Sequence, residues 1–262
     1  MPRYSPFRIH KEAAARGSVE VSERSGVRYL HLGSDTIQSA MRLARPNNLE
    51  LSYTRCMLAF LLFVPPPRRA VMIGLGGGSL PKFMHVRMPH TRVIAVEIDP
   101  RVVAAARQFF GLPEASGRLE VEIGDGAAYV QSLAGAADAV LVDGYRTDAA
   151  APELATKAFY EDCERALSDD GVLVTNLFSG RPGLDPHLRL LERAFPGRLL
   201  RLTDEQRGNL IVMAFVRARG QPTWKLLEQR ARELEAQYGL EFPAFVARLK
   251  EQNPHDSGRL LV

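Results

Sequence analysis

The sequence predicts an α/β protein built on a doubly wound, mostly parallel, seven-stranded sheet. Short apolar runs recur through the middle of the chain, and each is followed by a segment with helical character. The runs lack a strict polar–apolar alternation, as expected of strands that are buried on both faces. A glycine-rich turn, Gly74 to Ser79, follows the first run and leads into the first helix.

Residues 1–67 are predicted to form an N-terminal segment ahead of this sheet. Residues 1–17 are polar and are expected to be loosely held. Alternation on both sides of Ser25-Gly26 predicts a small β-hairpin over residues 18–33, and a short extended piece is expected at residues 36–39.

The end of this segment is predicted to be a single helix over residues 49–63. Three prolines at positions 65–67 would stop it, and they mark the first domain boundary. The apolar stretch at residues 57–64 is far shorter than the roughly 20 residues that a membrane span needs, so we expect no contact with a membrane.

Residues 68–220 are predicted to be the cofactor-binding α/β domain. Strands are expected at residues 70–73, 92–96, 119–123, 137–142, 171–176, 199–202 and 210–216. Helices are expected from about residue 79 and at residues 100–110, 127–133, 156–167 and 186–194. The last two strands are too close for a helix between them and should pair antiparallel. Residues 221–262 form a C-terminal extension, with one or two amphipathic helices over residues 223–250.

Composition narrows the function classes. The formal net charge is +4 and the arginines are scattered among acids, which argues against a nucleic-acid surface. The two cysteines, Cys56 and Cys163, show no metal-ligand spacing, and the histidines show none either, so no metal is expected. The first 17 residues have no apolar core of the secretory kind, and we expect a reducing, cytoplasmic location.

Ligands of doubly wound sheets bind beyond the carboxyl ends of the strands, so the residues that follow each strand are the candidates. The glycine turn lets a ligand approach the backbone closely, although it could serve only as a tight turn. Glu97, with Ile98 beside it, follows the second strand at the position where an acid commonly accepts bonds from ribose hydroxyls. Asp99 instead suits the cap of the next helix, which begins at Pro100.

Acids also follow the third and fourth strands. Asp125-Gly126 could accept a hydrogen bond from the adenine amine, or could simply form a turn or helix cap. Asp143 leaves the middle of the sheet and is the best candidate for a general base or substrate anchor. Tyr145 and Arg146 follow it and are predicted to contact the substrate.

The chain resembles the spermidine synthase family, within the wider S-adenosylmethionine methyltransferase fold. The resemblance covers about residues 19–217 and rests on the segments MIGLGGGSLPKF, VIAVEIDP, VEIGDGAAYV, AVLVDGY and TKAFYEDCERALSDDGVLVTNL. It implies a cofactor that is S-adenosylmethionine or its decarboxylated form, and a homodimer or tetramer built through the N-terminal hairpin.

The resemblance also implies roles for individual residues. Those implied to line the cofactor are Gly74, Gly76, Gly78, Glu97, Asp125 and Gly126. Asp143 would lie beside the attacking amine. Gln38 and Tyr53 resemble pocket residues of the family on the substrate side.

Three departures concern charge. The family's glycine loop carries an acid that grips the donor amine, whereas this chain has no acid between Ile73 and His90. Arg146 replaces a second acid after Asp143, and Met41-Arg42 stand where acids follow the pocket glutamine. A polyamine needs paired carboxylates to offset its desolvation, so the changes indicate an acceptor other than a standard polyamine, such as one with a carboxylate or phosphate.

The sequence therefore predicts a transferase that moves an aminopropyl or a methyl group to a small acceptor. One alternative is an inactive nucleoside-binding or oligomerising module of the same fold. Another is an NAD-dependent dehydrogenase, which shares the glycine turn and the acid after the second strand, although Gly124-Asp125-Gly126 favours the first hypothesis.

Overall fold

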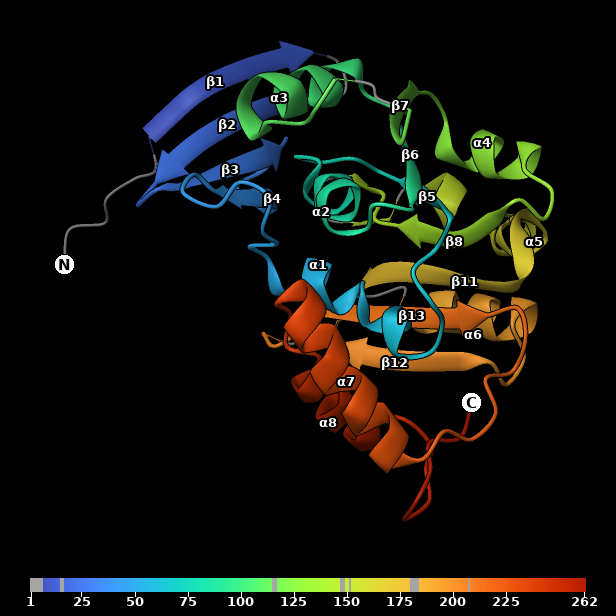
Figure 1. Cartoon of the computed structure of the whole chain (residues 1–262). Coiled ribbons are helices and arrows are strands. Elements are labelled where there is room, and N and C mark those ends of the chain that lie inside the picture. The colour runs from blue at the N-terminus through green and yellow to red at the C-terminus, as the bar shows by residue number, and fades with distance from the viewer. Residues whose placement is uncertain are drawn as a thin grey trace.

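The computed structural model describes residues 7–14, 17–114, 117–146, 149–150, 152–179, 184–206 and 208–262. Its centre is a seven-stranded sheet in the order β12-β13-β11-β8-β5-β6-β7 (Figure 1). The strands are β5 (Arg69–Ile73), β6 (Arg92–Glu97), β7 (Leu119–Ile123), β8 (Ala137–Val142), β11 (Leu167–Phe178), β12 (Leu199–Thr203) and β13 (Asn209–Phe215). The β13 strand pairs antiparallel with both β11 and β12, while the other pairs are parallel. The predicted doubly wound sheet is confirmed.

Helices cover both faces of this sheet because alternate residues of each buried strand point to opposite sides. On one face, Met72 and Leu141 share a core with α2 (Ser79–Arg87) and α3 (Pro100–Phe110). On the other, Val71 and Val140 pack with α4 (Gly126–Ser132), α5 (Lys157–Ala166) and α6 (Leu184–Ala194). Two short strands, β9 (Tyr145–Arg146) and β10 (Ala149–Ala150), and a 3-10 turn η2 (Pro152–Leu154) follow β8.

The N-terminal segment is a four-stranded antiparallel sheet rather than a two-stranded hairpin. It consists of β1 (Phe7–Ala14), β2 (Gly17–Arg24), β3 (Val27–Leu32) and β4 (Ile37–Arg42), in that order. The prediction that residues 1–17 are loosely held is wrong for β1, which pairs with β2 along its length and packs Ile9 against the core under this sheet. The sheet lies beside α3 at one end of the molecule (Figure 1).

The single helix predicted over residues 49–63 is also wrong. A short helix α1 (Ser52–Cys56) is followed by a 3-10 helix η1 (Ala59–Leu62). Every residue from Cys56 to Val64 is buried, so this apolar run belongs to the core rather than to a surface helix.

The C-terminal extension forms two helices, α7 (Trp224–Tyr238) and α8 (Phe242–Gln252), as the amphipathic pattern predicted. They pack against η1 and β12, at the end of the molecule away from β1 (Figure 1). Their buried side chains join the same core as those of α2, so the predicted divisions at residues 67 and 220 do not separate independent cores.

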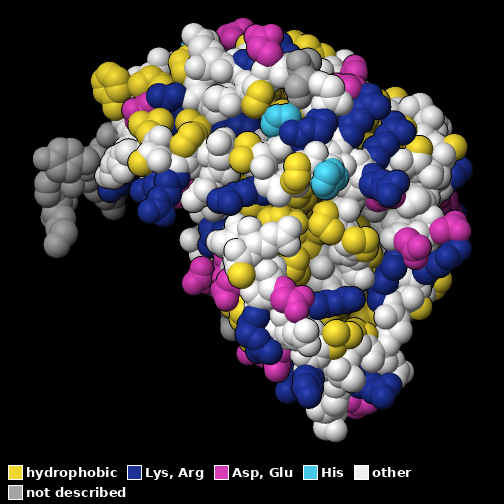
Figure 2. All heavy atoms as spheres, viewed as in Figure 1, with side chains coloured by type: hydrophobic (Ala, Val, Ile, Leu, Met, Phe, Trp, Pro, Cys, Tyr) yellow, Lys and Arg dark blue, Asp and Glu magenta, His cyan; other side chains and the backbone are white. Residues whose placement is uncertain are grey.

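Two surface properties bear on function. Within the described ranges, no helix is long and apolar enough to cross a membrane. On the face shown in Figure 2, basic side chains are spread among acidic and apolar ones rather than gathered in one continuous stripe.

Candidate active site

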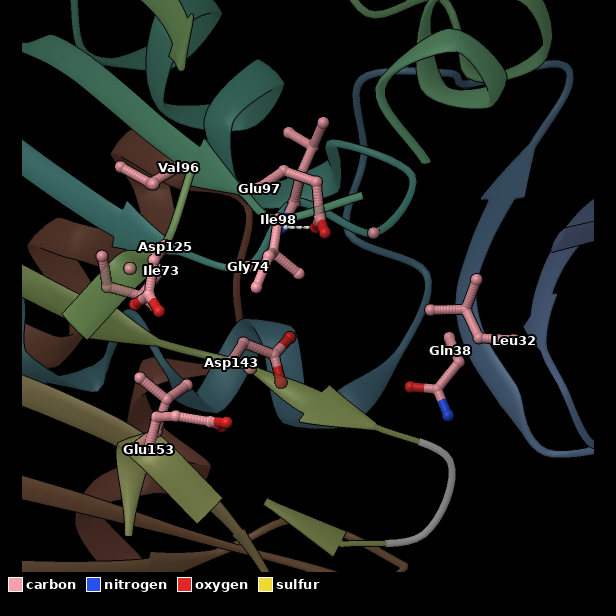
Figure 3. A pocket seen from close by; sticks show the side chains of 15 residues that line it. Leu32, Gln38, Ile73, Gly74, Val96, Glu97, Ile98, Asp125, Asp143 and Glu153 are labelled. Carbon is pink, nitrogen blue, oxygen red and sulfur yellow. Dashed lines mark hydrogen bonds between the residues drawn. The ribbon is translucent and has the colours of Figure 1, made fainter. Parts of the chain in front are cut away.

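Two cavities meet at the carboxyl ends of the central strands, under β3 and β4. The first encloses about 800 Å3 of space that opens to solvent. Its lining residues are Leu32, Gln38, Ile73, Gly74, Leu75, Gly76, Val96, Glu97, Ile98, Asp125, Gly126, Asp143, Gly144, Glu153 and Leu154. In Figure 3, Leu32 and Gln38 stand on one side of this cavity, across from Ile73, Gly74 and Asp125.

The glycine turn between β5 and α2 forms part of the cavity wall, and its backbone requires glycine. Gly74 and Gly76 have φ of 92° and 53°, in the left-handed region that other residues rarely adopt. A Cβ on Gly74 would lie 2.3 Å from the backbone oxygen of Asp143. The turn therefore brings β5 into close contact with the strand end that carries Asp143.

Gly78 lies at the far end of the glycine turn from Gly74. It is the left-handed N-cap of α2, and it does not line the first cavity. A Cβ there would lie 2.7 Å from a methyl carbon of Leu112. Close packing against Leu112, just beyond α3, accounts for the glycine, and the predicted contact of Gly78 with a cofactor stays a prediction.

Glu97 ends β6 and holds the glycine turn in place. Its Oε2 accepts a hydrogen bond from the backbone N–H of Leu75 at 3.0 Å, and its Oε1 accepts one from the backbone N–H of Asp99 at 3.0 Å. Burial raises the pKa of Glu97, and the two backbone donors lower it in part. The carboxylate lines the cavity, where it can also accept bonds from ligand hydroxyls.

Asp99 and Asp125 both cap helices, as the sequence allowed. Asp99 accepts a bond from the N–H of Arg101 at the start of α3. Asp125 uses a single oxygen, Oδ1, to cap α4 through Ala127 and Ala128 at 2.7 and 3.2 Å. Unlike Asp99, Asp125 lines the first cavity, so its second oxygen can serve a ligand while the first caps the helix.

Asp143 stands where the two cavities join. Its Oδ1 accepts a bond from the amide of Asn176 at 2.8 Å, and its Oδ2 accepts one from the hydroxyl of Tyr53 at 3.0 Å. That hydroxyl also lies 3.3 Å from the backbone oxygen of Gln38. Burial raises the pKa of Asp143, although both hydrogen bonds lower it in part. The carboxyl is thereby oriented and made a better proton acceptor than an exposed aspartate.

The second cavity, with about 820 Å3 of space that includes its opening to solvent, extends from Asp143 toward β12 and β13. The residues that line it are Ile37, Gln38, Glu50, Leu51, Ser52, Tyr53, Arg55, Asp143, Asn176, Phe178, Asp204, Glu205, Gln206 and Asn209. Gln38 and Asp143 line both cavities, so a ligand in one cavity can meet a ligand in the other at these two side chains.

Acids outnumber bases in the second cavity. It contains Glu50, Asp143, Asp204 and Glu205, with Arg55 as the described cation among its lining residues. The guanidinium of Arg55 is held by Glu241 at 2.7 Å and lies 4.0 Å from Glu205, and Glu50 forms an ion pair with Arg42. Asp204 is 3% exposed and accepts bonds from Ser52 Oγ at 2.7 Å and from the Asn209 N–H at 3.0 Å. The cavity therefore suits a ligand with positive charges.

Sequence reasoning missed these acids, although part of the pattern was available. Asn176 lies near the end of β11, and Asp204 directly follows β12, which runs parallel to β11 because both pair antiparallel with β13. Applying the strand-end rule to all seven strands would have named both residues as candidates, although not the cavity that they line. Glu50 lies in a loop before α1 and no comparable rule points to it.

Two predicted substrate residues cannot be placed by their side chains. The backbones of Tyr145 and Arg146 form β9, which pairs with β10, but their side chains lie outside the part of the chain that the structure describes. No cluster of His, Cys, Asp or Glu among the described residues could hold a metal ion. The site instead offers one carboxyl base between two acidic cavities.

Comparisons with known proteins find relatives of this sequence and of its fold. The model of the spermine/spermidine synthase domain matches residues 50–183. A polyamine aminopropyltransferase of Chromobacterium violaceum is 44% identical over 98% of this chain and 99% of its own length.

Two solved structures share the fold. A probable spermidine synthase from Corynebacterium glutamicum aligns with a TM-score of 0.71 at 19% identity, over 98% of each chain. Human methyltransferase-like protein 13, in complex with SAH, aligns with a TM-score of 0.65 at 28% identity, over 79% of this chain and 96% of that one.

Proposed function

This chain belongs to the spermine/spermidine synthase family, and on that premise we propose that it transfers an aminopropyl group from decarboxylated S-adenosylmethionine to an amine of a diamine or polyamine. As a transferase of this family it needs a donor site and an acceptor site that meet at the reacting atoms. The observation that carries the proposal is that Asp143 and Gln38 line both cavities.

The first cavity fits the donor. Glu97 would accept bonds from the ribose hydroxyls, and Asp125 a bond from the adenine amine. Its described lining contains four acids, Glu97, Asp125, Asp143 and Glu153, and no Lys, Arg or His. Decarboxylated S-adenosylmethionine carries a sulfonium and an ammonium, whereas the intact cofactor adds a carboxylate that these acids would repel. The charges thus favour the decarboxylated donor, although the glycine turn itself carries no acid.

The second cavity fits a polyamine. The sequence argument for a different acceptor counted only acids near Gln38 and Asp143 in the chain. The fold brings Asp204 and Glu205 to the same cavity from the β12–β13 turn. Asp204 is 3% exposed, whereas Glu205 is exposed and lies 4.0 Å from Arg55, so Asp204 is the better candidate to hold an ammonium group. A buried carboxylate favours a bound ammonium group, because an unpaired buried charge is costly.

The reaction would be a direct displacement. The lone pair of the acceptor nitrogen attacks the aminopropyl carbon that is bonded to sulfur. The C–N bond forms as the C–S bond breaks, and the bonding electrons leave with sulfur, which becomes the neutral thioether of methylthioadenosine. The proton released by the nitrogen passes to Asp143, whose orientation is fixed by Asn176 and Tyr53.

A second candidate, methyl transfer from intact S-adenosylmethionine, is favoured by two observations. The glycine turn from Gly74 to Ser79 has no acid, and the chain is 28% identical to a methyltransferase-like protein solved with SAH. The same Asp143 would then serve an amine that receives a methyl group.

Mass spectrometry of reaction products separates the candidates. Purified protein is incubated with each donor and with 1,4-diaminobutane. We expect methylthioadenosine and an aminopropylated amine from the decarboxylated donor only. A methylated amine from the intact cofactor would favour the second candidate. Binding of both donors without any product would support the inactive nucleoside-binding module.

The acceptor site has its own test in Asp204→Asn. We expect kcat/KM for 1,4-diaminobutane to fall by about 10-fold or more, since one charge-assisted contact to the second ammonium is lost. With butylamine, which lacks that ammonium, we expect variant and wild type to differ little. An equal loss with both amines would contradict a role for Asp204 in binding the far end of the acceptor.

A further inference from the structure

Ser39 joins the N-terminal sheet to the glycine turn. It lies in β4, its residue is 6% exposed, and its Oγ accepts a hydrogen bond from the backbone N–H of Gly77 at 2.8 Å. The residue before it, Gln38, lines both cavities, and its backbone oxygen accepts a hydrogen bond from the Tyr53 hydroxyl. This short segment of β4 therefore touches the donor side and the Asp143 side of the site together.

The contact between Ser39 and the turn is close. A Cβ on Gly76 would lie 2.6 Å from Ser39 Oγ, and a Cβ on Gly77 would lie 3.1 Å from Ser39 Cβ. The turn also bonds within its own domain: the Gly74 N–H donates to the Val96 backbone oxygen, and the Leu75 N–H donates to Glu97. Ser39 thus sets how closely β4 approaches the wall formed by Gly76.

We propose that Ser39 is a positioning residue for the transfer reaction. By holding the Gly77 N–H it fixes the turn against β4, so that a donor bound along Gly74 and Gly76 faces an amine held beside Gln38 and Asp143. Ser39 itself touches no reacting atom. The inference rests on the proposed function, because it assigns the donor to the first cavity.

A separate contact keeps β4 in place when this bond is lost. The buried Lys82 of α2 donates to the backbone oxygen of Pro46 at 2.9 Å and to that of Phe110. It also contacts the sulfur of Met41 in β4. Because Lys82 ties the end of β4 to α2 and α3, removal of the Ser39 hydroxyl should alter the fit at the turn without releasing the sheet.

The test compares Ser39→Ala with a matched control. Ser22 lies in β2 of the same sheet, is also 6% exposed, and bonds to His31 at 2.9 Å away from the turn. Ser22→Ala removes a buried hydroxyl from the sheet without changing the site. Ser39→Thr keeps a hydroxyl at the position.

Calorimetric titration with methylthioadenosine gives the first readout, because this ligand fills the donor site without needing turnover. We expect Ser39→Ala to weaken its binding by about 5- to 30-fold, as the Gly77 N–H loses its buried acceptor. We also expect kcat to fall by about 10-fold with the KM for the diamine unchanged, since the donor loses alignment. Ser39→Thr should recover most of the affinity, and Ser22→Ala should match wild type in both.

Two results would overturn the proposal. Equal affinities and equal kcat values for Ser39→Ala and Ser22→Ala would show that the bond has no positioning role. A Ser39→Thr variant as weak as Ser39→Ala would show that the hydroxyl is not the group that matters. If wild type binds methylthioadenosine but forms no aminopropylated product, the proposed function fails while the titration still tests Ser39.

Discussion

Substituting Gly74 with alanine tests the contact between the glycine turn and Asp143. Gly74 has φ of 92°, which costs an alanine about 1 kcal/mol. The new Cβ would lie 2.3 Å from the backbone oxygen of Asp143, a clash with main chain that no side-chain rotation relieves. Overpacking of this kind costs about 1–3 kcal/mol more, so we expect Gly74→Ala to lower the free energy of unfolding by about 2–4 kcal/mol.

The matched control is Gly111→Ala. Gly111 caps α3 with φ of 63°, and a Cβ there would meet nothing within 4 Å. We expect Gly111→Ala to lower the free energy of unfolding by about 1 kcal/mol, from the left-handed backbone alone, and to leave turnover unchanged. Urea unfolding measures both variants, and turnover shows whether Asp143 has moved. Equal losses of stability, or a fully active Gly74→Ala enzyme, would refute the close approach of the turn to Asp143.

Three further predictions concern charged groups. Asp143→Asn should lower kcat by about 100- to 10,000-fold. In the wild-type enzyme, the raised pKa of Asp143 should make kcat fall on acidification at a pH above the ordinary aspartate range. A pH profile of kcat without this fall would contradict a role of Asp143 as the base. Burial lowers the pKa of Lys82 from 10.5 to about 8, so between these pH values the unfolded chain binds more protons than the folded protein does. The free energy of unfolding should therefore rise with pH across that window. Urea titrations at pH 7.5 and at pH 10 should show this rise in the wild-type protein and not in Lys82→Met. Asp125→Ala and Asp99→Ala should each lower the free energy of unfolding by about 0.5–2 kcal/mol, because each removes a helix cap. By calorimetry, only Asp125→Ala should bind methylthioadenosine more weakly than wild type. Equal affinities of the two variants would contradict a place for Asp125 in the donor site.

The central sheet could be predicted from the sequence because its strands are buried on both faces. Apolar runs such as those of β5 and β8 leave no other interpretation when helices follow them. Prediction failed where tertiary contacts decide the local structure. β1 is polar enough to be taken for a loose end, and it is ordered by pairing with β2. The run from Cys56 to Val64 is apolar enough for a helix, yet the structure has a short α-helix that ends at Cys56 and a 3-10 helix after it.

The candidate site was predicted as far as the carboxyl ends of parallel strands could be followed. This rule found Glu97, Asp125 and Asp143, which line the first cavity. It could not show that the turn after β12 brings Asp204 to the same site as Asp143, because that depends on the order of the strands. The charge of the second cavity is therefore a property of the fold, and counting acids near Gln38 in the sequence underestimated it.

The most direct test of the account is calorimetric titration of the wild-type protein with decarboxylated and with intact S-adenosylmethionine. Four acids and no described cation line the first cavity, so the account predicts tighter binding of the decarboxylated form. Binding of the intact cofactor that is equal or tighter would contradict the assignment of this acidic cavity to an aminopropyl donor.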